Sequence, residues 1–111
     1  PYGAAKLASE SLLLGHAAAF GSRVRCQRFF NVYGPRQDPS SPYSGVISLF
    51  LKNFRAGNPV TVFGDGLNTR DFISVTDVAR ANALAALRDD ITSGVTNICT
   101  GQPLSLRRIL E

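Results

Sequence analysis

The chain has 111 residues, of which 44% are hydrophobic and 18% are charged, so it has room for one modest core and is too apolar to be a disordered chain. No apolar run approaches the roughly 18 to 20 residues of a membrane helix. The formal net charge of +4 comes from scattered Lys and Arg residues, which argues against a nucleic-acid-binding arm.

The first half of the chain predicts a helix, a strand, a loop and a second helix. An Ala- and Leu-rich helix over residues 2–20 is closed by Gly21, and residues 24–31 form a strand. A turn-rich loop over residues 34–43 leads to an amphipathic helix over residues 45–56. The expected buried side of that helix consists of Val46, Leu49, Phe50, Leu51 and Phe54.

The second half predicts three strands that alternate with helices, over residues 60–63, 70–75 and 95–99. Thr76 and Asp77 begin a helix that runs to about residue 90, with Asp77 as its N-cap, and Ser105 begins a last helix. The inward side of the helix that begins at Thr76 and Asp77 is expected to consist of Val78, Ala79, Ala83, Leu84 and Leu87. Alternating strands and helices indicate an α/β fold.

The cysteines and the histidine favour neither a disulfide framework nor a metal site. Cys26 and Cys99 lie in apolar, strand-like segments, which fits free buried thiols in a reducing cytoplasm. His16 has no acidic or thiol neighbour with which to bind a metal. The chain begins at Pro1 without Met and ends inside a helix-like stretch, so we expect a fragment of a longer protein.

The first segment with chemical potential is Y-G-A-A-K, from Tyr2 to Lys6. Side chains four residues apart on a helix point the same way. A free tyrosine loses its proton at about pH 10, and a neighbouring ammonium favours the phenolate, which suits Tyr2 for acid–base chemistry near neutral pH. The spacing alone is also common in purely structural helices.

Two further segments carry polar groups after predicted strands. The first, R-F-F-N-V-Y-G-P-R, ends its strand at Asn31, where ligands gather in open α/β sheets, although such an Asn also simply closes a turn. The second, V-T-V-F-G-D-G-L-N-T-R-D-F-I-S-V-T-D, begins at residue 60 and includes Arg70. The Arg70 guanidinium suits a diphosphate, and its structural alternative is an ion pair with Asp65 or Asp71.

In this order and spacing the three segments resemble the nucleotide-sugar epimerase and dehydratase branch of the extended short-chain dehydrogenases, over essentially the whole chain. The resemblance implies part of a Rossmann-type α/β fold, mainly its smaller substrate-binding portion. Residues 1–33 would hold the catalytic Tyr helix and the following strand, and residues 34–111 the nucleotide-sugar-binding segment. The glycine-rich turn of the dinucleotide-binding half and the family's catalytic Ser or Thr are absent from this chain.

The resemblance also implies an activity. Tyr2 would take the proton of the sugar 4-hydroxyl during transient oxidation at C4 by NAD, and Lys6 would hold the nicotinamide ribose and favour the phenolate. The expected parent is a 4-epimerase of UDP-glucose and UDP-galactose or of UDP-N-acetyl-hexosamines. A 4,6-dehydratase and a non-catalytic nucleotide-binding remnant remain alternatives, and the 111-residue chain alone is expected to be inactive.

Binding roles are implied at further positions. On the cofactor side these are Phe29 and Val32, beside Tyr2 and Lys6. On the nucleotide-sugar side they are Asn31, Gly45, Val46, Thr61, Phe63 and Arg70, with the strand of Thr61 and Phe63 reading the base and Arg70 gripping the diphosphate.

The resemblance further implies a homodimer or higher oligomer in which the Tyr helix lies at the subunit interface. The apolar residues expected to be exposed on that helix are Leu7, Leu12, Leu13 and Phe20.

Overall fold

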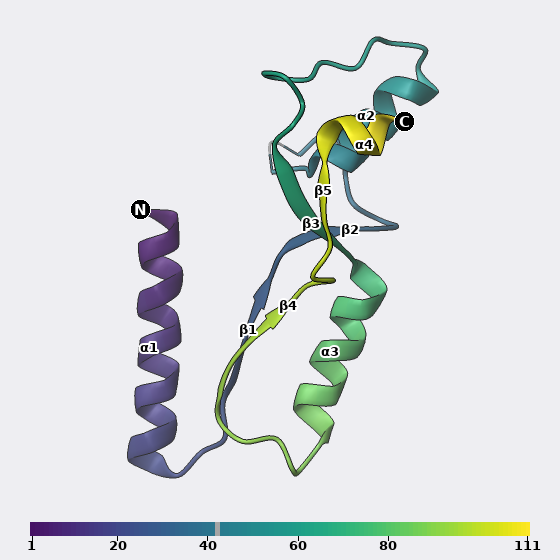
Figure 1. Ribbon diagram of the computed structural model, residues 1–111. Helices are drawn as coiled ribbons and strands as arrows, with labels where there is room; N and C mark the ends of the chain where they lie inside the picture. Colours follow the sequence, from purple (N-terminus) through teal and green to yellow (C-terminus); the bar gives the residue numbers. More distant parts are fainter. Residues whose placement is uncertain (42) are drawn as a thin grey trace.

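The computed structural model describes residues 1–41 and 43–111. Helices and strands alternate along them, which confirms the predicted α/β class (Figure 1). The elements are α1 (Tyr2–Phe20), β1 (Arg25–Phe29), β2 (Asn31–Tyr33), α2 (Val46–Arg55), β3 (Thr69–Ser74), α3 (Val75–Leu87), β4 (Gly94–Ile98), β5 (Pro103–Ser105) and α4 (Leu106–Leu110). Within this described part, no helix is both long and apolar enough to cross a bilayer.

The strands form two small sheets that meet where β1 ends. β1 pairs in parallel with β4, and β2 pairs in parallel with β3, which pairs in turn with β5 in antiparallel fashion. The predicted strand over residues 24–31 is therefore divided: Phe30 N–H still donates to Ile98 O, after which the chain leaves β4 for β3. This change of partner places Phe29 and Asn31 at the junction of the two sheets.

The molecule is elongated and buries few side chains. Its radius of gyration is 17.3 Å, whereas a compact domain of this length has about 13 Å. The long helix α1 lies beside β1 without packing closely on it, and α3 lies on the other side (Figure 1). The buried apolar side chains of the described residues are Ala17, Phe50, Ile73 and Val78.

The predicted inward sides of α2 and α3 are therefore wrong in part. On α2 only Phe50 is buried, Val46 is half-buried, and Leu49, Leu51 and Phe54 are exposed. On α3 the inward side consists of Val78 with the half-buried Ala81 and Ala85. The remaining positions predicted to face inward are exposed, namely Ala79, Ala83, Leu84 and Leu87. So many residues of α3 are alanine that the pattern does not distinguish its faces, and Ala81 and Ala85 allow close approach to the strands.

The predicted strand over residues 60–63 does not form. Both edges of β3 are already paired, one by β2 and the other by β5, a strand that the sequence pattern did not predict. The segment instead runs into a turn in which Gly64 and Gly66 adopt φ of 80° and 72°, and Leu67 N–H donates to Asp65 Oδ1 at 3.0 Å. Left-handed backbone of this kind favours glycine and ends a strand.

Helix ends agree with the sequence except around α3. Gly21 closes α1 in the left-handed conformation with φ 65°, and Ser105 caps α4, as predicted. Ser74 rather than Asp77 caps α3, because its hydroxyl accepts the Thr76 N–H at 3.2 Å. Asp77 lies in the first turn, where a carboxylate interacts favourably with the helix dipole, and the helix ends at Leu87 rather than near residue 90.

Candidate active site

Tyr2 and Lys6 lie on one face of the first turns of α1. The helix forms because its residues are mainly Ala, Leu and other straight-chain types, with no β-branched side chain. Lys6 Nζ lies 5.5 Å from the centroid of the Tyr2 ring, so the two groups point the same way as the spacing predicts. Tyr2 is 76% exposed, which leaves its hydroxyl open to a ligand.

An open groove of about 580 Å³ runs between α1 and β1, within the range of about 300 to 1,000 Å³ typical of ligand pockets. It contains Tyr2 and Lys6 together with Phe29, the last residue of β1. The groove residues are Tyr2, Lys6, Ser9, Glu10, Leu13, Arg25, Cys26, Gln27, Arg28, Phe29 and Asn82.

The chemistry of this groove fits one end of a nicotinamide dinucleotide. The Lys6 ammonium and the Tyr2 hydroxyl can donate to ribose hydroxyls, and the half-exposed Phe29 ring offers an apolar surface to a flat ring. Three of the residues predicted for the cofactor therefore lie together. Val32, the fourth, is on β2 and lines a different depression.

That second depression brings together Asn31, Val32, Gly45 and Val46, where β2 meets the start of α2. Its volume of about 30 Å³ suits a water molecule rather than a sugar. Asn31 Nδ2 donates to Asp71 O at 3.0 Å, which ties β2 to β3 and leaves Asn31 Oδ1 as a further acceptor. Asn31 thus links two strands rather than closing a local turn, the alternative considered from the sequence, and part of its amide stays available.

Thr61, Phe63 and Arg70 lie outside the α1–β1 groove. All three are exposed, and Phe63 is 85% exposed. Across the described part of the chain, Arg70 forms no ion pair with Asp65 or Asp71, so the structural alternative considered for it is wrong.

Asp71 is instead a buried anchor between β3 and the segment after β4. Its carboxylate accepts Thr100 N–H at 2.9 Å, Thr100 Oγ1 at 3.0 Å and Gly101 N–H at 2.7 Å. The Thr100 backbone hydrogen bond is the main reason that the pKa of Asp71 lies below its usual range.

Sequence reasoning missed Glu10 and Arg28, which face each other across the groove. Arg28 Nε and Nη2 donate to the two carboxylate oxygens of Glu10 at 2.8 and 2.7 Å. The hydrogen bond from Arg28 holds the pKa of the Glu10 carboxyl below its usual range. The signal was present: Glu10 follows Lys6 by four residues, as Lys6 follows Tyr2, so all three share one helical face.

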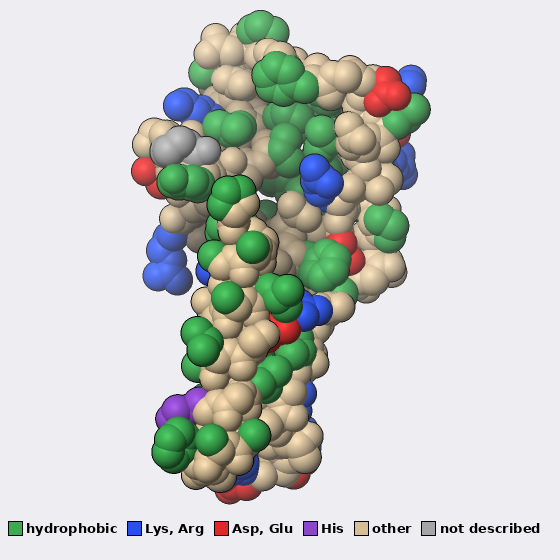
Figure 2. Space-filling model, turned by 90° about the vertical axis from the view of Figure 1, so that its left-hand side faces the viewer, with side chains coloured by type: hydrophobic (Ala, Val, Ile, Leu, Met, Phe, Trp, Pro, Cys, Tyr) green, Lys and Arg blue, Asp and Glu red, His purple; other side chains and the backbone are tan. Residues whose placement is uncertain are grey.

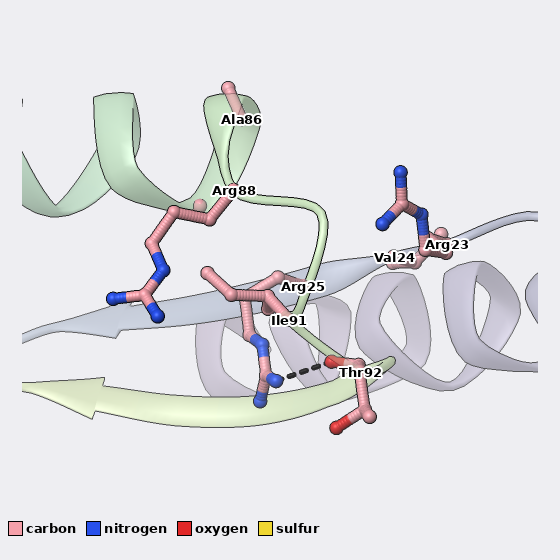
Figure 3. A pocket seen from close by; sticks show the side chains of 8 residues that line it. Arg23, Val24, Arg25, Ala86, Arg88, Ile91 and Thr92 are labelled. Atoms are coloured by element: carbon pink, nitrogen blue, oxygen red, sulfur yellow. Dashed lines mark hydrogen bonds between the residues drawn. The ribbon is translucent and has the colours of Figure 1, made fainter.

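A second pocket, at the opposite end of β1, contains Arg23, Arg25 and Arg88 (Figure 3). These cations are already engaged: Arg23 pairs with Asp89, Arg88 pairs with Asp90, and Arg25 donates to Thr92 O. We therefore place the candidate active site in the α1–β1 groove, where Lys6 lies over Tyr2.

Comparison with known proteins supports the resemblance. The model of the "NAD dependent epimerase/dehydratase family" matches residues 1–99. The whole chain is 36% identical to a putative UDP-glucose 4-epimerase of Methanocaldococcus jannaschii, and 99% of it is 36% identical to a dTDP-glucose 4,6-dehydratase of Streptomyces griseus. These matches cover 35% and 32% of the relatives.

The chain also resembles a solved structure. The chain superimposes with a TM-score of 0.92 and 38% identity on the UDP-N-acetylglucosamine 4-epimerase of Methanobrevibacter ruminantium in complex with UDP-N-acetylmuramic acid, over 98% of this chain and 34% of that one. The chain thus spans about a third of the length of the proteins it matches. With a family match over residues 1–99 and the same backbone arrangement, the chain belongs to the NAD dependent epimerase/dehydratase family.

Proposed function

We propose that the chain is the part of a nucleotide-sugar 4-epimerase that carries its acid–base pair, acting on UDP-glucose and UDP-galactose or on UDP-N-acetyl-hexosamines. The observation that carries the proposal is the meeting of Tyr2, Lys6 and Phe29 in one groove at the carboxyl end of β1. NAD, when bound, supplies the acceptor and donor of the C4 hydride.

The chain's own residues handle the proton and the placement. Tyr2 Oη takes the proton of the sugar 4-hydroxyl and returns it at the end of the turnover. The Lys6 ammonium, next to the Tyr2 ring, stabilises the phenolate electrostatically and donates to ribose hydroxyls. Phe29 would exclude water from one side of the nicotinamide ring.

The remaining binding roles belong to the same proposal. Asn31 offers Oδ1 to the sugar nucleotide, Val32 borders the cofactor, and Gly45 and Val46 lie beside the nucleotide. Thr61 and Phe63 contact the base, without the strand expected there, and the unpaired Arg70 side chain grips the diphosphate. We place the parent in the cytoplasm, where the free thiols of Cys26 and Cys99 stay reduced. We also propose a homodimer or higher oligomer, because large apolar side chains of α1 are exposed, namely Leu7, Leu12, Leu13 and Phe20. Figure 2 shows hydrophobic side chains along this side of the molecule.

The test uses the protein as its gene encodes it, with UDP-glucose and UDP-galactose supplied separately. Tyr2→Phe removes the proton-carrying oxygen and keeps the ring, so kcat should fall by about 100- to 10,000-fold with little change in KM. Tyr43→Phe is the matched control, since Tyr43 is 93% exposed and lies outside the groove. Full turnover by Tyr2→Phe would contradict the proposal.

A 4,6-dehydratase is the second candidate, because a relative of that activity is as identical to the chain as the first epimerase. Both reactions begin with the same proton transfer, so Tyr2→Phe does not separate them. Mass spectrometry of the product does: epimerisation leaves the mass unchanged, whereas a dehydratase removes a water from the sugar. No turnover of either kind, with nucleotide binding retained, would indicate the non-catalytic alternative.

A further inference from the structure

Helix α1 reaches the strands through one polar side-chain contact within the described residues. Arg28, on β1, donates from Nε and Nη2 to both carboxylate oxygens of Glu10. The other side-chain hydrogen bonds of α1 are local, from Ser9 to Ala5 O and between His16 and Ser22. The Glu10–Arg28 pair is therefore the polar side-chain link between α1 and β1.

The burial of its acid distinguishes this pair from the other described ion pairs, one of which, Arg88–Asp90, has the same two-pronged geometry. Both carboxylate oxygens are used, and such a fork fixes orientation as well as distance. The Glu10 side chain is only 15% exposed, whereas the acids of the other described ion pairs are between 53% and 96% exposed. Exposed pairs contribute little fixed geometry, and in this pair the acid is largely withdrawn from water while the Arg28 side chain stays 52% exposed.

The pair also lies next to the residues of the groove that we propose to act in catalysis. Glu10 follows Lys6 and Tyr2 at successive four-residue intervals on one face of α1. Arg28 directly precedes Phe29 at the end of β1. Fixing Glu10 to Arg28 therefore fixes the Tyr2–Lys6 face over the carboxyl end of β1.

A second consequence concerns Lys6. On a helix, the acid four residues away is its natural partner. Arg28 compensates the charge of Glu10, no ion pair joins Lys6 to Glu10 among the described residues, and Lys6 Nζ lies over the Tyr2 ring. The other charged or titratable groups of the groove are Arg25, which is bound to Thr92 O and Thr96 Oγ1, and Cys26.

We propose that Glu10 and Arg28 are positioning residues of the active site, which hold the Tyr2–Lys6 face of α1 over the end of β1 and keep Glu10 from neutralising Lys6. This inference rests on the proposed function, since the pair acts through Tyr2 and Lys6. It adds a specific role for two side chains that act by placing α1 and Lys6.

The test compares Arg28→Met, Glu10→Gln and the double variant in the protein as its gene encodes it. Arg28→Met leaves Glu10 free to pair with Lys6, so kcat should fall about 10- to 100-fold with KM little changed. Adding Glu10→Gln removes the carboxylate that competes for Lys6, so kcat should recover in part. It should stay below the wild-type value, since α1 is still unanchored.

Arg88→Met is the matched control, because it removes an arginine from another exposed ion pair, outside the groove. Equal losses of kcat in Arg28→Met and in the double variant would reduce the pair to a purely structural contact and overturn the inference. Wild-type turnover itself decides the proposed function separately. If it is absent, hydrogen exchange of residues 2–20 decides the anchoring: exchange should quicken in Arg28→Met and not in Arg88→Met, and no difference refutes it.

Discussion

At the scale of single residues, two carboxylates hold separate elements of the fold together. Glu10 ties α1 to β1, and Asp71 ties β3 to the segment after β4 through Thr100 and Gly101. A carboxylate can accept several N–H groups at once, which suits it to places where the backbone turns and regular pairing ends. The chain thus uses buried acceptors where its small core cannot fix the geometry.

Asp71 makes the stability of the fold depend on pH. Its folded-state pKa is depressed by the hydrogen bonds from Thr100 and Gly101, so its contribution is present above the unfolded value of about 3.9 and is lost as pH falls through the folded value. Asp71→Asn should lower the melting temperature at pH 7 and bring wild type and variant together in acid. Thermal unfolding between neutral and acid pH measures this, with the 96% exposed Asp89 changed to Asn as the control. An Asp71→Asn deficit that persists unchanged in acid would contradict it.

At the scale of elements, the sequence predicted helix ends but did not predict which strands and side chains pair with one another. Gly21 and Ser105 were predicted as helix ends because their roles depend on neighbours in the chain. The segment over residues 60–63 has strand composition, yet β2 and β5 already occupy both edges of β3. Tyr2, Lys6 and Phe29 were predicted as parts of one site, whereas Arg28 was missed because its partner lies eighteen positions earlier in the chain.

The N-cap of α3 is a testable case at this scale. Ser74→Ala removes the acceptor of the Thr76 N–H and should lower the free energy of unfolding by about 1 kcal/mol. Ser74→Asp keeps an acceptor and adds a charge that the helix dipole favours, so it should be neutral or stabilising. Denaturant unfolding of both variants distinguishes the cap from a general effect of substitution. Equal losses in the two variants would show that the hydroxyl does not act as the cap.

At the scale of the whole molecule, more large apolar side chains are exposed than buried among the described residues. The radius of gyration of 17.3 Å and the sparse core mean that helices which read as amphipathic keep large side chains in solvent. The pattern of α2 and α3 correctly indicated helices, but the expected burial of Leu49, Phe54 and Leu87 presupposed neighbours that the described residues do not supply. Which face of a helix is covered is a property of the assembled molecule.

The 111-residue chain expressed alone should therefore be inactive and self-associate. Tyr2 and Lys6 form only one side of an open groove, so UDP-glucose and UDP-galactose should not interconvert measurably. The exposed fractions of Leu7, Leu12 and Phe20 on α1 are 58%, 74% and 74%, and exposed apolar surface drives association. Light scattering should give a mass above that of a monomer, and Leu7→Gln with Leu12→Gln should lower it more than Leu87→Gln on α3. A monomeric wild-type chain would refute association through α1, and turnover by the isolated chain would refute its predicted inactivity.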